Sequence, residues 1–97
     1  MPSVLHAYRY YDGKGVQRNY STALYWFLQA AEQGKRDAQY MSGLMYYFAR
    51  GVNQDYKQAR YWYQKAAEQG YVYAQLNLGG MYHEGEGGNQ DYRTALY

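Results

Sequence analysis

Residues 55–70 read DYKQARYWYQKAAEQG, and this stretch decides the fold. Asp55 is an N-cap residue whose side chain can accept a hydrogen bond from the first backbone amides of a helix, and Gln58 follows three residues later, as in a capping box. Gly70 stands where a helix ends in the left-handed conformation. Between these signals runs a single apolar stripe at helical spacing, which predicts a helix that packs on other helices: Ala59, Trp62, Tyr63, Ala66 and Ala67.

This stretch belongs to a repeat with a period of 36 residues. Ala30–Gly34 returns as Ala66–Gly70, and Asn53–Tyr56 returns as Asn89–Tyr92; in all, 17 of the 32 residues in 30–61 are identical to the residue 36 positions later. A fixed period of this length indicates an array of stacked units. We therefore expect one domain, 1–97, of about two and a half repeats, with units at 1–34, 35–70 and 71–97 and the last one truncated.

Each unit reads as two helices joined by a glycine turn. Asn19 and Asp91 repeat the N-cap, and Gly34 repeats the stop. Gly43 and Gly79 lie at matching positions inside the first helix of their units, where glycine costs about 1 kcal/mol relative to alanine, so a neighbouring helix is expected to approach the backbone there. The pattern predicts an all-α fold with helices at 4–12, 20–33, 38–49, 56–69 and 74–84, and a sixth from Asp91.

Composition argues against several classes of protein. Ten Lys and Arg against eight Asp and Glu leave a net charge of +2, too weak a field to attract a nucleic-acid backbone. There is no Cys to form a disulfide, and no apolar run approaches the roughly 20 residues of a membrane span. The N-terminus lacks the features of a secretory signal, so we expect a cytoplasmic protein if Met1 is the native start.

The residues from Ala38 to Gly70 resemble a known repeat. Their pattern, Ala-Gln-x-x-x-Gly-x-Met-Tyr followed by Gln-Asp-Tyr-x-x-Ala-x-x-Trp-Tyr-x-Lys-Ala-Ala-Glu-Gln-Gly, is similar to the Sel-one-like repeat (SLR), a relative of the tetratricopeptide repeat. Two positions depart from it: Ser42 stands where Leu78 keeps the family's leucine, and Ala49 replaces the first turn glycine. The resemblance implies a right-handed superhelical solenoid of antiparallel helix pairs with a concave face lined by the first helices. It also implies adaptors or scaffolds in bacterial and eukaryotic signalling and assembly, and no reaction.

Residues that could carry chemistry are few. His6 and His83 are 77 residues apart in non-neighbouring units, and none of the three serines stands in a nucleophile motif. His83, Glu84 and Glu86 lack the spacing of a zinc or calcium site and read as solvated turn residues. We therefore expect no enzyme, no cofactor and no metal.

Sixteen Tyr are the extreme of the composition. Seven of them coincide with apolar positions of the repeat and are expected in the core: Tyr10, Tyr20, Tyr46, Tyr56, Tyr63, Tyr82 and Tyr92. Another stripe of the first helices, with Tyr40, Leu44, Tyr47 and Phe48 in the second unit, should face the groove by analogy with tetratricopeptide repeats. Its equivalents are Val4, Tyr8, Tyr11 and Asp12 in the first unit and Leu76, Gly80, His83 and Glu84 in the third.

We expect the partner-binding residues on this stripe to be Tyr8, Tyr11, Tyr40, Leu44, Tyr47, Phe48, Leu76 and His83. Exposed Tyr and Phe are typical of protein contact surfaces, yet the same rings could instead cover adjacent units, and the sequence leaves both interpretations open. A second row on the second helices, formed by Tyr25, Tyr61 and Tyr97, indicates either ring contacts or another binding strip.

The resulting hypothesis is a non-catalytic scaffold or adaptor that binds a protein or peptide on its concave aromatic face. One alternative is a glycan-binding or cell-envelope regulatory repeat protein, since Tyr and Trp rings stack on sugars. Another is a truncated or engineered segment without autonomous function. Because the last unit stops at Tyr97, a homodimer through the incomplete ends is also expected.

Overall fold

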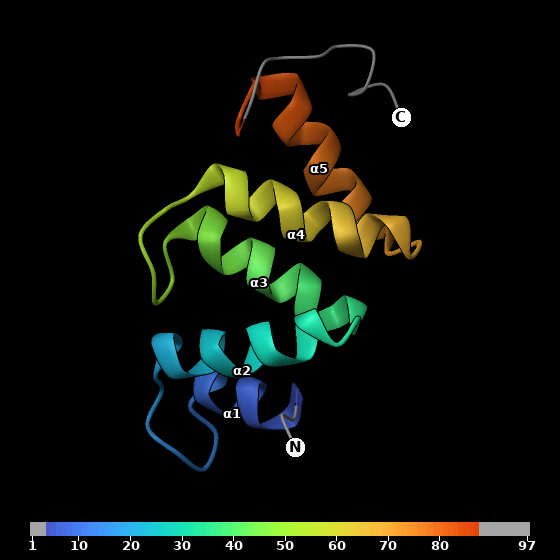
Figure 1. The fold of residues 1–97 in the computed structure, drawn as a ribbon. Helices are drawn as coiled ribbons and strands as arrows, with labels where there is room; N and C mark the ends of the chain where they lie inside the picture. Colours follow the sequence, from blue (N-terminus) through green and yellow to red (C-terminus); the bar gives the residue numbers. More distant parts are fainter. Residues whose placement is uncertain (1–3, 88–97) are drawn as a thin grey trace.

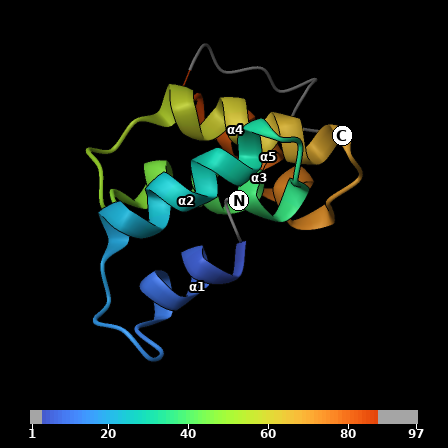
Figure 2. The ribbon, with the colours of Figure 1, turned by 60° about the horizontal axis from the view of Figure 1, so that its bottom comes forward.

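The computed structural model describes residues 4–87, and these form five α-helices and no strand (Figure 1). Each helix packs on the next one along the chain, so that α1 and α5 lie at opposite ends of a stack. When the α1 end is turned forward, α2 to α5 overlap along the line of sight (Figure 2). The predicted all-α solenoid is confirmed. Its helices are α1 (Val4–Asp12), α2 (Tyr20–Glu32), α3 (Arg36–Phe48), α4 (Tyr56–Glu68) and α5 (Val72–Glu84).

The predicted caps of α2 and α4 are confirmed. The side chain of Asp55 accepts a hydrogen bond from the Gln58 amide at 3.1 Å, and Asn19 accepts from Thr22 at 3.1 Å. The capping box is only half formed, because the Asp55 backbone N–H donates to the carbonyl of Tyr46 at 3.0 Å and not to the Gln58 side chain. This bond ties the start of each second helix to the end of the first. The sixth helix and its Asp91 cap lie outside the described residues.

Helices α3 and α5 begin two residues earlier than predicted. Gly34 and Gly70 take left-handed backbone angles, with φ of +91° and +82°, and thus end α2 and α4 as expected. The next residues, Lys35 and Tyr71, are already the N-caps of α3 and α5, in extended conformation and without a side-chain cap hydrogen bond. One glycine thus separates the C-cap residue of one helix from the N-cap residue of the next, and neither N-cap has a capping side chain that could be recognised in the sequence.

The close approach predicted at Gly43 is confirmed. A Cβ atom on Gly43 would lie 2.7 Å from Cδ1 of Tyr63 and 3.0 Å from the carbonyl oxygen of Ala59, both on α4. Helix α4 thus packs directly on the α3 backbone. The partner expected for Gly79 is the sixth helix, which is outside the described residues.

Small residues set the spacing of the remaining helices. Alanines with no exposed surface occur on every described helix, so backbones come close together while large side chains fill the gaps between them. Trp62, only 8% exposed, belongs to the larger core cluster. The alanines are Ala7, Ala23, Ala30, Ala38, Ala59, Ala66 and Ala74.

Repeated hydrogen bonds and turns join one unit to the next. Nε2 of Gln39 donates to the carbonyl of Ala31 at 3.2 Å, and Gln75 makes the same bond to Ala67 at 3.2 Å. A turn glycine of each following unit rests on the first turn of the preceding second helix. A Cβ on Gly51 would lie 2.5 Å from the backbone of Tyr20 and Ser21, and one on Gly87 would lie 2.8 Å from the Tyr56 carbonyl.

Most of the tyrosines predicted for the core do pack there. Tyr63 is the largest fully buried side chain, and partly buried tyrosines surround the two core clusters: Tyr10, Tyr20, Tyr46 and Tyr56. Tyr82 is partly buried with the Arg60 guanidinium 4.2 Å from its ring centroid, whereas Tyr92 is outside the described residues. In the described part of the chain, no helix combines the length and the apolar character needed to cross a bilayer.

Candidate functional site

A groove of about 620 Å³ runs along α5 and opens toward the C-terminal end of α3; we name it the α5 groove. It brings together four of the predicted partner-binding residues, Tyr47, Phe48, Leu76 and His83. Within the described part of the chain, the lining is Tyr47, Phe48, Tyr63, Val72, Gln75, Leu76, Asn77, Gly79, Gly80, Met81, His83, Glu84 and Glu86.

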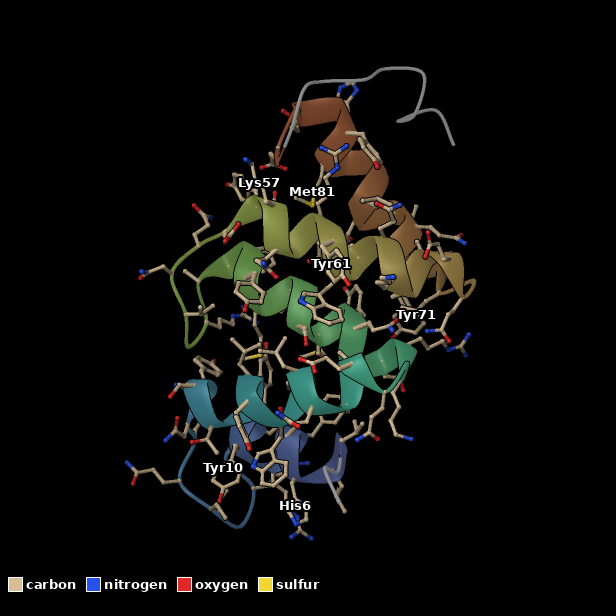
Figure 3. All side chains as sticks on the ribbon, viewed as in Figure 1. His6, Tyr10, Lys57, Tyr61, Tyr71 and Met81 are labelled. Atoms are coloured by element: carbon tan, nitrogen blue, oxygen red, sulfur yellow. The ribbon has the colours of Figure 1, made fainter. Side chains whose placement is uncertain are left out.

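Large apolar side chains lie exposed along the α5 groove. Phe48 is 53% exposed, Val72 is 53% exposed and Leu76 is 67% exposed. Met81, by contrast, is directed from α5 toward α4 and packs against Ala59 and Tyr63 beneath the groove (Figure 3). Exposed apolar residues scattered singly are ordinary, but a group that lines one concavity marks a contact surface.

A missing side chain opens the middle of the groove. Gly80 occupies the position that Leu44 fills in the preceding unit, 36 residues earlier. A Cβ atom placed on Gly80 would meet no atom of residues 4–87 within 4 Å, whereas one on Gly43 would collide with α4. Packing therefore explains the glycine at position 43 but not the one at position 80.

A hydrogen bond links the two sides of the groove. The hydroxyl of Tyr47 on α3 donates to the Glu86 carboxylate in the turn after α5, 2.9 Å from each oxygen. The Tyr47 ring is held by Phe48 at a centroid distance of 4.9 Å and by Tyr56 at 5.1 Å. Burial, together with this hydrogen bond and the charge of Glu86, raises the pKa of the Tyr47 hydroxyl to about 12, so the phenol stays neutral at ordinary pH.

The end of the groove near Glu86 carries negative charge. Glu84, the last residue of α5, also lines it, and the C-terminus of α3 at Phe48 lies beside it. Helix C-termini add partial negative charge to these carboxylates. Neither carboxylate forms an ion pair within residues 4–87. Over the same residues, His, Asp and Glu form no group of three that could hold a metal ion.

In the first unit, the predicted residues Tyr8 and Tyr11 do not line the α5 groove. Tyr8 packs edge-on against Phe27 at a centroid distance of 5.0 Å, and burial raises the pKa of its hydroxyl to about 12. Tyr11 contacts Tyr20 at 5.2 Å, and its hydroxyl accepts a hydrogen bond from Arg50. Both rings pack against neighbouring helices. This agrees with the alternative interpretation, in which the rings of this stripe cover other parts of the array.

In the second unit, Tyr40 and Leu44 are partly covered by neighbouring side chains. Tyr40 stacks with Tyr63 at 5.6 Å and with Tyr71 at 5.2 Å, while Leu44 packs on the cluster formed by Ala59, Tyr63 and Met81. Figure 3 shows Tyr71 where α4 gives way to α5. Phe48, at the C-terminal end of α3, is the exposed residue of this stripe, and the other three are partly buried.

Some groove residues were missing from the predicted site. Gly80 and Glu84 lie on the predicted stripe of the third unit but are not among the predicted binding residues. Val72 lies in the first turn of α5, before the predicted start of that helix at residue 74, whereas Gln75 follows that predicted start. Glu86 comes from the turn after α5. Continuing the helical spacing of Leu76 back by one turn would have found Val72.

The second row of tyrosines contacts its own helices. Tyr25 packs edge-on against Trp26 at 5.4 Å, and Tyr61 against Trp62 at 4.9 Å, so each ring rests on the tryptophan that follows it. Both remain about half exposed, at 57% and 51%. Tyr97 is outside the described residues.

Comparisons with known proteins agree with this architecture. The family model of the Sel1 repeat matches residues 5–35, 36–71 and 72–97. The structure is similar to the crystal structure of a Sel1 repeat protein from Oxalobacter formigenes, with a TM-score of 0.93 and 40% identity over 96% of this chain. It is also similar to a protective antigen of uropathogenic Escherichia coli with an SLR fold, with a TM-score of 0.93 and 37% identity over 95% of this chain.

The chain spans 38% and 20% of the lengths of these two bacterial proteins. A comparison with curated protein sequences found no significant match. The three consecutive family matches, together with the stacked helix pairs, show that the chain belongs to the Sel1 repeat family.

Proposed function

We propose that this chain is a non-catalytic binding module that holds a peptide segment of a partner protein in the α5 groove. Sel1 repeat proteins are in general scaffolds that mediate protein–protein interactions, and this supports the class of function. The observation that carries the proposal is the group of exposed apolar side chains, Phe48, Val72 and Leu76, in one groove. Binding of a partner that covers these apolar side chains removes their surface from water, which lowers the free energy of the complex.

Selection from a random peptide library displayed on phage tests the proposal. The immobilised 97-residue chain should enrich a limited set of peptides, and their affinities can be measured by fluorescence polarisation with synthetic copies. The Phe48→Ala variant should weaken binding by about 1 to 3 kcal/mol, as for an anchor residue of an interface. Its thermal stability should change little because Phe48 is half exposed.

Tyr25→Ala is the matched control. Tyr25 is a similarly exposed ring that also makes one edge-on contact with a sequence neighbour, but it lies on α2, away from the groove. Peptides that bind the wild type and Tyr25→Ala equally, and Phe48→Ala poorly, would support the proposal. Selection of no peptide, or equal binding to all three proteins, would contradict it.

A further inference from the structure

We infer that the α5 groove selects extended peptides in which a large apolar side chain is followed or preceded at close spacing by Lys or Arg. The apolar side chain fills the hollow over Gly80, and the cation lies beside Glu84 and Glu86. This inference rests on the proposed function and adds to it the chemistry of the ligand.

The hollow over Gly80 explains the apolar part of the ligand. A glycine inside a helix costs about 1 kcal/mol relative to alanine, and at this position the protein gains no packing in return. The exposed side chains of Phe48 and Leu76 border the hollow and offer it apolar walls. The leucine found at the equivalent position 44 would fill this space. A ligand side chain can do so instead, and it would reach the helix backbone directly.

Charge complementarity explains the basic part. Among residues 4–87, the groove lining contains Glu84 and Glu86 and no Lys or Arg, and the C-terminal ends of α3 and α5 lie at the same end of the groove. Arg50 contacts Phe48 from outside the lining and is already engaged with Tyr11. Since the whole chain carries +2, the attraction for a cation is local to this end of the groove.

The distance along α5 from Gly80 to Glu84 sets the spacing between the apolar and the basic side chain of the ligand. Gly80 and Glu84 are one helical turn apart, about 6 Å at a rise of 1.5 Å per residue. Two residues of an extended peptide cover about the same distance, and their side chains point to the same face. We therefore expect the apolar residue and the basic residue two positions apart in the ligand.

A synthetic peptide array tests this directly. Each peptide carries one Leu or Phe and one Lys, Arg, Gln or Glu in a Gly-Ser background, with zero to three residues between the two. Binding of the whole 97-residue chain is measured by fluorescence polarisation at low and high salt. Peptides with Lys or Arg should bind at least about tenfold more tightly than their Glu counterparts, and this advantage should shrink at high salt because exposed charges are screened.

Two pairs of variants locate the binding. Gly80→Leu fills the hollow and should lower affinity about tenfold or more, whereas Gln64→Leu adds the same side chain to an exposed site on α4 and should leave affinity unchanged. Glu84→Gln should reduce the preference for Lys and Arg. Glu68→Gln makes the same change in net charge outside the groove and should preserve that preference. Circular dichroism verifies that each variant is folded.

The outcomes separate this inference from the proposed function. Binding without a preference for Lys or Arg, or undiminished binding by Gly80→Leu, would overturn the inference. If no array peptide binds while the phage selection yields peptides that depend on Phe48, the inference fails and the proposed function stands. If neither experiment yields a binder, both fail. A basic preference that is lost in Gly80→Leu and Glu84→Gln, and kept in both controls, supports the inference.

Discussion

Two glycines in equivalent first helices should respond to the same substitution with opposite signs. In Gly43→Ala the new methyl group meets the ring of Tyr63 at 2.7 and 2.9 Å and the Ala59 carbonyl at 3.0 Å. The ring is only 1% exposed and has no room to move aside. Overpacking of this kind costs about 1–3 kcal/mol, and these three contacts place it near the upper end. Alanine regains about 1 kcal/mol of helix propensity, so we expect a net loss of about 2 kcal/mol.

In Gly80→Ala the methyl group meets no atom of the described residues within 4 Å. Only the helix propensity remains, and the variant should gain about 1 kcal/mol of stability. For a domain of this size, 1 kcal/mol corresponds to a rise in Tm of about 4–8 °C.

Thermal and urea unfolding followed by circular dichroism at the helical band give both values. The wild type and the two variants should be compared at one protein concentration, so that any association contributes equally. Stability changes of the same sign in both variants would contradict this packing difference, because the two substitutions differ in what surrounds the added methyl group.

Three further variants or conditions test other contacts. Ala49 has φ of 57° and is the one non-glycine residue with positive φ within 4–87. Ala49→Gly should therefore raise the free energy of unfolding by about 0.5–1 kcal/mol, after the larger entropy of the unfolded glycine chain is subtracted. A lower urea midpoint would contradict this. The buried hydroxyl of Ser42 has no hydrogen-bond partner among residues 4–87, so Ser42→Ala should raise stability by about 1 kcal/mol. A fall in Tm would show that the hydroxyl is satisfied. The pKa values of Tyr8 and Tyr47 rise from 10 to about 12 on folding, so the unfolded chain releases these protons first, and stability should be full below pH 10 and fall as the pH rises toward 12. Tyr8→Phe and Tyr47→Phe should flatten this fall in urea titrations, and unchanged slopes would count against the assigned pKa values.

The fold could be predicted from the sequence because its signals are local and recur in each unit. Asp55 and Asn19 cap their helices through their own side chains, and Gly43 marks a close contact by its cost. The starts of α3 and α5 escaped prediction because Lys35 and Tyr71 cap them with backbone geometry alone. No residue type announces such a start.

The candidate site was only partly predictable, for a different reason. Helical spacing identifies a face of α3, but it does not say which parts of that face the next unit covers. Tyr40 is covered because Tyr71 and Tyr73 reach over it, with centroid distances of 5.2 and 6.4 Å. The equivalent of Tyr71 in the preceding unit is Lys35, so the repeat pattern does not predict an aromatic contact at this position.

Because the contacts between units repeat with the period of the sequence, the array can be lengthened by duplication of a whole unit. The Gln39 bond to Ala31 and the Gln75 bond to Ala67 are the same contact shifted by one period, and the turn glycines Gly51 and Gly87 repeat in the same way. A duplicated copy of residues 36–71 would therefore meet on each side a surface that already fits it. Such a duplication adds a unit without requiring a new interface, so mutation can lengthen the array in whole units and extend its binding surface while each junction stays intact.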